Sequence, residues 1–175
     1  MTFDLTAEQQ ALIARAATLT SLPRRALDAV LAIEARAAVA GSDDALTALG
    51  GRQHAQPLLM AAAAAIGIGR AAIAHAREWM TSNDVKPGPD ETVPHWAFAD
   101  GATDVEAARL LTYNAAQMLD RGENADDAIT RAHAFAANSA QRAVDAAIRV
   151  VGDFSRGSVL ERLSQDAKTL QVAAR

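Results

Sequence analysis

The chain has 175 residues, of which 50% are hydrophobic and 22% charged, with a formal net charge of −4 and no cysteine. The lack of cysteine excludes disulfides, thiolate zinc sites, iron–sulfur clusters and a cysteine nucleophile, and the mild acidity without a basic block argues against a nucleic-acid partner. Aromatic residues make up only 4%, whereas alanine, the best helix former, is the most frequent residue. The composition therefore predicts one all-α domain with helices packed closely on small side chains.

The first residues, Met1 to Asp4, lack the basic region of a secretory signal. The longest apolar run, Pro57 to Gly69, ends at Arg70 and is shorter than the roughly 20 residues of a membrane span. We therefore expect a soluble, cytoplasmic protein without a membrane partner.

The first 50 residues predict N-terminal helices that precede the main domain. Thr6 and Gln9 have the spacing of a capping box at the start of a helix over residues 6–20. Pro23 suits the first turn of a second helix that extends to about Ala40, and residues 45–49 form a short helical piece before two glycines.

The longest predicted helix covers residues 52–80 and is apolar on nearly every face between Leu58 and Ile68. Such a helix belongs in the middle of a bundle. Gly67 and Gly69 would each cost about 1 kcal/mol relative to alanine in an exposed helix. We expect these glycines to allow close approach of a neighbouring backbone.

The remaining chain predicts a proline-rich loop over 81–94 and three further helices over 95–121, 125–151 and 159–171. Asn124 and Ser158 are the expected caps of the last two. The domain from 51 to 175 is thus expected to be an up-and-down four-helix bundle with one or two extra N-terminal helices. The buried face of helix 95–121 is predicted to comprise Phe98, Ala102, Val105, Ala108, Leu111, Ala115 and Met118.

Few polar residues suggest chemistry by themselves. His75 and Glu78 have the i,i+3 spacing found in di-iron bundles, but no second copy of the motif occurs, so a partly exposed helix surface is favoured over a metal site. Asp100 and Asp104 could flank a site, but aspartates near a helix start also suit the helix dipole. We predict no metal.

Two tryptophans bracket the proline-rich loop. Trp79 and Trp96, with His95 and Phe154, could line a small-ligand pocket, since bundle cores can host ligands. The alternative is that the tryptophans anchor the loop to the bundle.

Several segments resemble the acyl-CoA dehydrogenase family. Residues 98–113, FADGATDVEAARLLTY, resemble the family helix that reads LADMAT followed by EAARLL, and residues 159–172, VLERLSQDAKTLQV, are similar to its closing PVERLYRDAKIYQI segment. Residues 65–72 resemble the first helix of the family's C-terminal domain, and residues 3–11 resemble the way these enzymes open. The resemblance implies the C-terminal helical domain of an FAD-dependent enzyme family.

The resemblance also places the family's functional positions on residues of a different kind. The catalytic glutamate falls on Ala174 and the alternative base position on Pro57, and neither residue can take a proton. The arginine segment that helps to hold the FAD pyrophosphate falls on Thr81, and the glycine-rich flavin turn on Gly152 and Asp153. The resemblance therefore implies no catalytic residue in this chain, and FAD only if a partner subunit completes the site.

The family's full architecture includes a middle β-domain, to which no stretch of these 175 residues corresponds. We therefore expect an interaction module without autonomous catalysis that forms a dimer or tetramer and can pair with a full-length acyl-CoA dehydrogenase homologue. The alternative is a subunit of a heteromeric FAD-dependent acyl-CoA dehydrogenase, an oxidoreductase on CH–CH groups, whose partner supplies the base and the β-domain.

Overall fold

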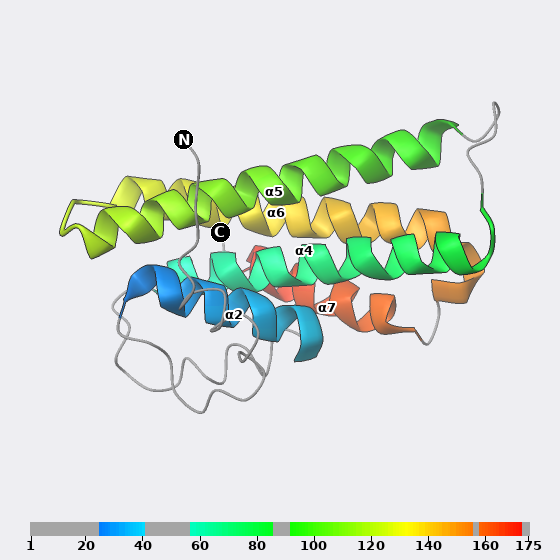
Figure 1. The fold of residues 1–175 in the computed structure, drawn as a ribbon, viewed down its shortest axis with the longest axis horizontal. Coiled ribbons are helices and arrows are strands. Elements are labelled where there is room, and N and C mark those ends of the chain that lie inside the picture. The colour runs from blue at the N-terminus through cyan, green and yellow to red at the C-terminus, as the bar shows by residue number, and fades with distance from the viewer. Residues whose placement is uncertain (1–24, 41–56, 86–91, 156–157, 173–175) are drawn as a thin grey trace.

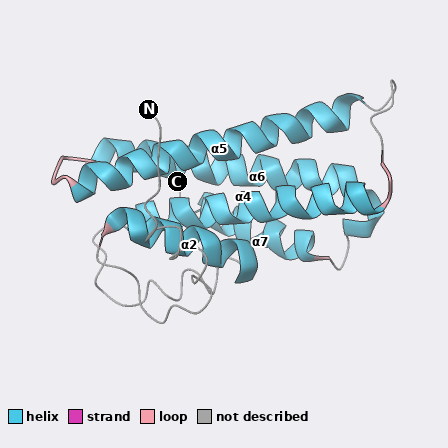
Figure 2. Ribbon diagram, viewed as in Figure 1, coloured by secondary structure: helices cyan, strands magenta, loops and turns pink. Residues whose placement is uncertain are grey.

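The computed structural model describes residues 25–40, 57–85, 92–155 and 158–172. These ranges hold five α-helices and a short 3₁₀ turn and contain no strand (Figure 2). The elements are α2 (Ala26–Ala40), α4 (Pro57–Ser82), α5 (Thr92–Asp120), α6 (Asp126–Val151), η3 (Gly152–Ser155) and α7 (Val159–Val172). The predicted helices 6–20 and 45–49 lie outside the described residues.

Helices α4, α5, α6 and α7 form an up-and-down bundle, in which each helix runs opposite to the one before it (Figure 1). Helix α2 packs against α4 and α5 and runs parallel to α4 (Figure 1). The all-α four-helix bundle predicted from the sequence is thus confirmed, with α2 as an added helix.

Helix α4 is the centre of the bundle and packs against each of the other four helices. Nearly every residue from Leu59 to Gly69 is buried, as the all-round apolar pattern predicted. By length and composition α4 could also cross a membrane, contrary to the expectation from the sequence. However, 67% of its most apolar stretch is buried inside the bundle, as in the core helix of a soluble protein.

The two glycines of α4 lie where other helices approach most closely. A Cβ atom on Gly67 would collide with the backbone oxygen of Glu34 and would lie 2.8 Å from the Cβ of Ala37, both on α2. A Cβ on Gly69 would lie 2.7 Å from a Val105 methyl group on α5. The expected approach of a neighbouring backbone is confirmed at Gly67, whereas the atom closest to Gly69 belongs to a side chain.

Two details of the prediction for α5 were wrong. The helix begins at Thr92, so Pro94 lies within its first turn, where the missing N–H of proline costs no hydrogen bond. Leu111 is 44% exposed, whereas Thr112 and Tyr113 are buried. The buried side of α5 faces both α2 and α6, which moves Leu111 to the outer edge of the buried stripe of this helix.

The Ser158 cap of α7 is confirmed by the bond from the Leu160 N–H to the Ser158 hydroxyl.

We expect Gly67→Ala to lower the free energy of unfolding by about 1–3 kcal/mol, because overpacking against the α2 backbone outweighs the gain in helix propensity. Gly101→Ala is the matched control, since its Cβ would lie 3.3 Å from Ala143 Cα, a milder overlap than the one at Gly67. Urea unfolding followed by circular dichroism would compare the two. Equal stability of both variants would contradict the close packing of α2 on α4.

Candidate functional site

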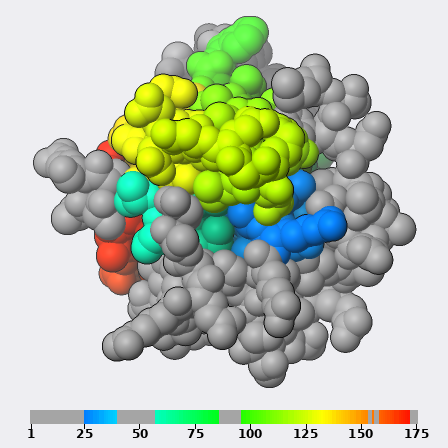
Figure 3. Space-filling view, turned by 90° about the vertical axis from the view of Figure 1, so that its left-hand side faces the viewer, coloured from blue at the N-terminus to red at the C-terminus, as the bar shows by residue number. Residues whose placement is uncertain are grey.

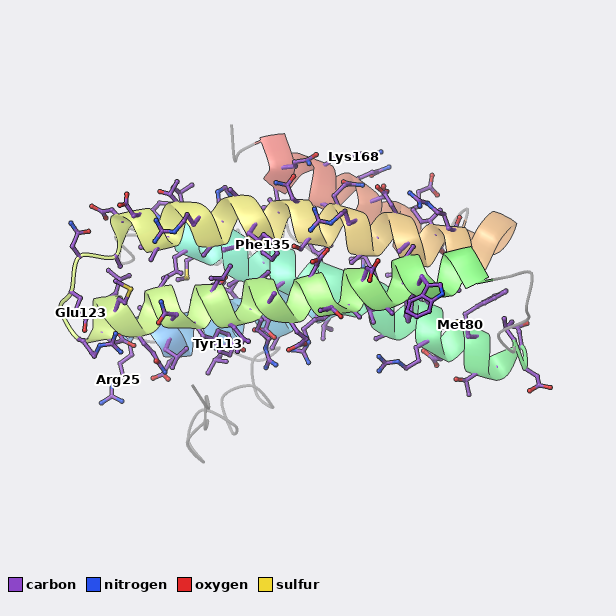
Figure 4. All side chains as sticks on the ribbon, turned by 90° about the horizontal axis from the view of Figure 1, so that it is seen from above. Arg25, Met80, Tyr113, Glu123, Phe135 and Lys168 are labelled. Atoms are coloured by element: carbon purple, nitrogen blue, oxygen red, sulfur yellow. The ribbon has the colours of Figure 1, made fainter. Side chains whose placement is uncertain are left out.

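A cluster of charged and polar side chains joins α2 to α4 and α5. Glu34 of α2 is only 2% exposed. Its Oε1 accepts a hydrogen bond from Arg70 Nη1 of α4 and lies 3.1 Å from Arg109 Nε of α5. Its Oε2 accepts a 2.6 Å hydrogen bond from the Tyr113 hydroxyl. We call these four residues the Glu34 cluster; Tyr113 is labelled in Figure 4.

The spacing of residues along α4 and α5 explains why the three partners of Glu34 lie close to its carboxylate. Arg109 and Tyr113 are one turn apart on α5 and share a side of the helix, and Arg109 Nε also donates to the Tyr113 hydroxyl at 2.8 Å. The Arg109 guanidinium carbon lies 5.1 Å from the centre of the Tyr113 ring. Arg70 follows Gly67 by three residues, so the close approach of α2 at Gly67 brings Glu34 within reach of Arg70.

The cluster changes the proton affinity of two of its members. Burial is the largest single influence on the pKa of Arg109 and lowers it, but Glu34, Tyr113 and Glu106 together raise it by more, so the net pKa lies above the usual range. Burial raises the pKa of Tyr113, and Glu34 raises it further, against an opposing effect of Arg109. The Glu34 carboxylate is therefore enclosed by donors, an arrangement that holds α2, α4 and α5 together.

Helix α2 is fixed at its beginning as well. The carboxylate of Asp120, the last residue of α5, accepts hydrogen bonds from the backbone N–H groups of Ala26 and Leu27 at 2.8 and 3.1 Å. A negative charge at a helix N-terminus also interacts favourably with the helix dipole. In the view onto the end of the molecule where α2 begins, the turn between α5 and α6 lies above α2 and α4 (Figure 3).

The positions that the resemblance assigns to FAD lie at one end of the bundle, where α4 ends and η3 begins (Figure 1). The Thr81 hydroxyl donates to the Arg77 carbonyl one turn earlier. Gly152 has a left-handed φ of 64° and its N–H bonds to the Ile148 carbonyl, and Asp153 lies in η3 with its side chain outside the described ones. None of the three residues supplies a positive charge to a pyrophosphate.

The two positions assigned to the catalytic base are not brought into a site within the described residues. Pro57 is the first residue of α4, at the end of that helix opposite to Thr81. Ala174 lies outside the described residues, which end at Val172.

The hypothetical pocket around the tryptophans is not formed by the side chains that the structure describes. Trp79 is partly buried and packs against the core, which agrees with an anchoring role. Trp96 is 70% exposed, so it lines no enclosed pocket. The side chains of His95 and Phe154 lie outside the described ones.

The other candidate polar residues form no metal-binding group in the part of the chain that the structure describes, where no three His, Cys, Asp or Glu residues converge. Asp104 forms a 2.8 Å ion pair with Arg142 of α6, and Asp100 is exposed. His133 of α6 is 3% exposed, and burial lowers its pKa.

Comparison with known proteins identifies the family to which the helical domain is related. The model of the acyl-CoA dehydrogenase C-terminal domain matches residues 58–174. The chain is 35% identical over 115 residues to an acyl-CoA dehydrogenase of Bacillus subtilis (strain 168) and 32% identical over 115 residues to a 3-(aryl)acrylate reductase of Clostridium sporogenes (strain ATCC 15579). Each alignment covers 63% of this chain and 30% of the relative.

The chain is also similar to one in a solved structure of the electron transferring flavoprotein of Acidaminococcus fermentans. That structure was described with regard to flavin-based electron bifurcation. The TM-score is 0.59 at 26% identity, and the match covers 77% of this chain and 35% of the other. The chain therefore belongs to the acyl-CoA dehydrogenase family, as the sequence motifs predicted, through the family's C-terminal helical domain. It spans about 30% of the length of the curated relatives that it matches, and α2 lies outside the matched residues.

The Glu34 cluster was not predicted from the sequence. The available signal was a glutamate within the apolar segment LAIEARAAVA, on the same helical stripe as Val30, Leu31 and Ala37. A charge at such a position needs partners. The sequence does not show which of the arginines on other helices lie opposite to it.

Tyr113 is the only tyrosine of the chain, so its ionisation can be followed by tyrosinate absorbance. The pKa in the folded state is raised above the value of about 10 of an unperturbed tyrosine. Its contribution to stability is therefore complete below pH ~10 and is lost as pH rises above that value. We expect no tyrosinate in the folded protein near pH 10, and ionisation at lower pH in Glu34→Gln. An ordinary titration midpoint with intact helical circular dichroism would contradict the cluster.

Proposed function

We propose that this domain works by association with other subunits, with itself and with a full-length acyl-CoA dehydrogenase homologue, and has no catalytic activity of its own. The observation that carries the proposal is an exposed apolar face on α5. Trp96, Leu110 and Leu111 are exposed by 70%, 49% and 44%. Leu110 and Leu111 are adjacent, and large apolar side chains exposed side by side are typical of an interaction site.

The charges on this part of α5 are paired with other side chains. From Thr103 to Met118 the charged residues are Asp104, Glu106 and Arg109. Asp104 pairs with Arg142 of α6, Arg109 pairs with Glu34 of α2, and Glu106 lies 3.4 Å from Arg109. In a two-fold symmetric dimer each surface meets its own copy, so the part of α5 around Leu110 and Leu111, whose neighbouring charges are paired, can associate with itself without repulsion.

The absence of autonomous catalysis is supported by the residues at the family's base positions. Neither Pro57 nor Ala174 has an ionisable side chain. The most deeply buried carboxylate of the described residues, that of Glu34, is engaged by Arg70, Arg109 and Tyr113.

A second candidate is a subunit of a heteromeric FAD-dependent acyl-CoA dehydrogenase whose partner supplies the base and the β-domain. It is favoured by the position of Thr81 and Gly152 at one end of the bundle. The likeness to a chain in a flavoprotein structure also favours it. In this alternative the partner provides the positive charges that these two positions lack.

Size exclusion with light scattering and absorbance detection would test the first proposal. We expect a colourless dimer or tetramer, and we expect Leu110→Lys or Leu111→Lys to weaken association about tenfold or more, because a charge would face its own copy. Thr169→Lys on the exposed side of α7 is the matched control and should leave association unchanged.

A monomer at all concentrations that also fails to bind an acyl-CoA dehydrogenase homologue would contradict the proposal. A stoichiometric flavin band in the chain alone would contradict both candidates. A flavin band that arises only on co-expression with a homologue would favour the heteromeric enzyme.

A further inference from the structure

A groove of about 510 Å³ lies between α2, α4 and α5, and its lining includes none of the positions that the family resemblance marks. Ile73 and Val105, which are almost fully buried, form its floor. Alanines from all three helices line its walls, among them Ala74 of α4. Because α2 lies outside the residues matched by the family, the groove combines the family domain with an element of this chain.

Two arginines and one glutamate lie at the rim of the groove. Arg70 and Arg77 line it from α4 and stand seven residues, about 10 Å, apart. Arg70 bonds to Glu34 and keeps 43% of its side chain exposed. Glu106, the acidic residue of the lining, lies 3.4 Å from Arg109. Among the described residues, none forms an ion pair with Arg77 within 4.0 Å.

We propose that this groove binds a small amphipathic anion, a carboxylate with a saturated hydrocarbon chain. The guanidinium of Arg77 pairs with the carboxylate, and the chain lies over Ile73 and Val105. The volume is within the range of small-molecule sites, about 300–1,000 Å³. The two arginines are only about 10 Å apart. This distance matches the length of a small amphipathic anion better than that of a long helix of a partner protein. This inference is independent of the association proposed for α5.

Titration calorimetry with decanoate would test the site in the full chain. We expect one decanoate per chain. Arg77→Gln should weaken binding about tenfold or more through loss of a charge-assisted hydrogen bond. Ala74→Phe should abolish binding by filling the groove from its exposed wall. Acetate, which lacks the chain, and a decyl trimethylammonium ion, which has the opposite charge, should not bind.

Arg131 and Ala134 on α6 are matched controls, because both are exposed and have the same three-residue spacing as Ala74 and Arg77. Arg131→Gln and Ala134→Phe should leave decanoate binding unchanged. Circular dichroism would establish that all four variants keep the helical fold.

Three results would overturn the proposal. The first is no decanoate binding in the millimolar range. The second is binding that neither Arg77→Gln nor Ala74→Phe changes, or that the cationic amphiphile equals. The third is an acidic amphipathic peptide that binds with sensitivity to both substitutions while decanoate does not, which would assign the groove to a protein partner.

Discussion

A buried carboxylate is the constraint on which the arrangement of this domain depends. Glu34 is 2% exposed, and removal of a carboxylate from water costs several kcal/mol unless charges and hydrogen bonds replace the lost solvation. Arg70, Arg109 and Tyr113 provide that replacement from two different helices. The charge can be accommodated only when α2, α4 and α5 are together, so the cluster specifies one position for α2.

The geometry of that position depends on small residues. Gly67 allows the α2 backbone to contact α4 at Glu34 itself, and Arg70 follows on the same side of α4. Asp120 then fixes the beginning of α2 through two backbone hydrogen bonds. A larger residue at Gly67 would separate the helices and move Glu34 away from its partners. Helix α2 thereby becomes part of the bundle although it lies outside the matched family domain.

Local patterns predicted most of the fold but not the contacts between distant helices. The apolar run of α4 and the Ser158 cap are encoded within a few residues, and the structure agrees with them. The exposure of Leu111 was missed because it depends on the direction from which α2 approaches α5. The Glu34 cluster was missed for the same reason, since its members are up to 79 residues apart in the sequence.

The apolar face on α5, proposed for association, and the groove beside α2, proposed for a small anion, are separate surfaces. The Glu34 cluster holds α2, one wall of the groove, in place. Native-state hydrogen exchange of the α2 amides tests this claim most directly. We expect α2 to be protected as strongly as α4 in the wild type, and Glu34→Gln to speed exchange in α2 while α4 and α6 stay protected. Fast exchange of α2 in the wild type, or protection that the substitution leaves unchanged, would contradict it.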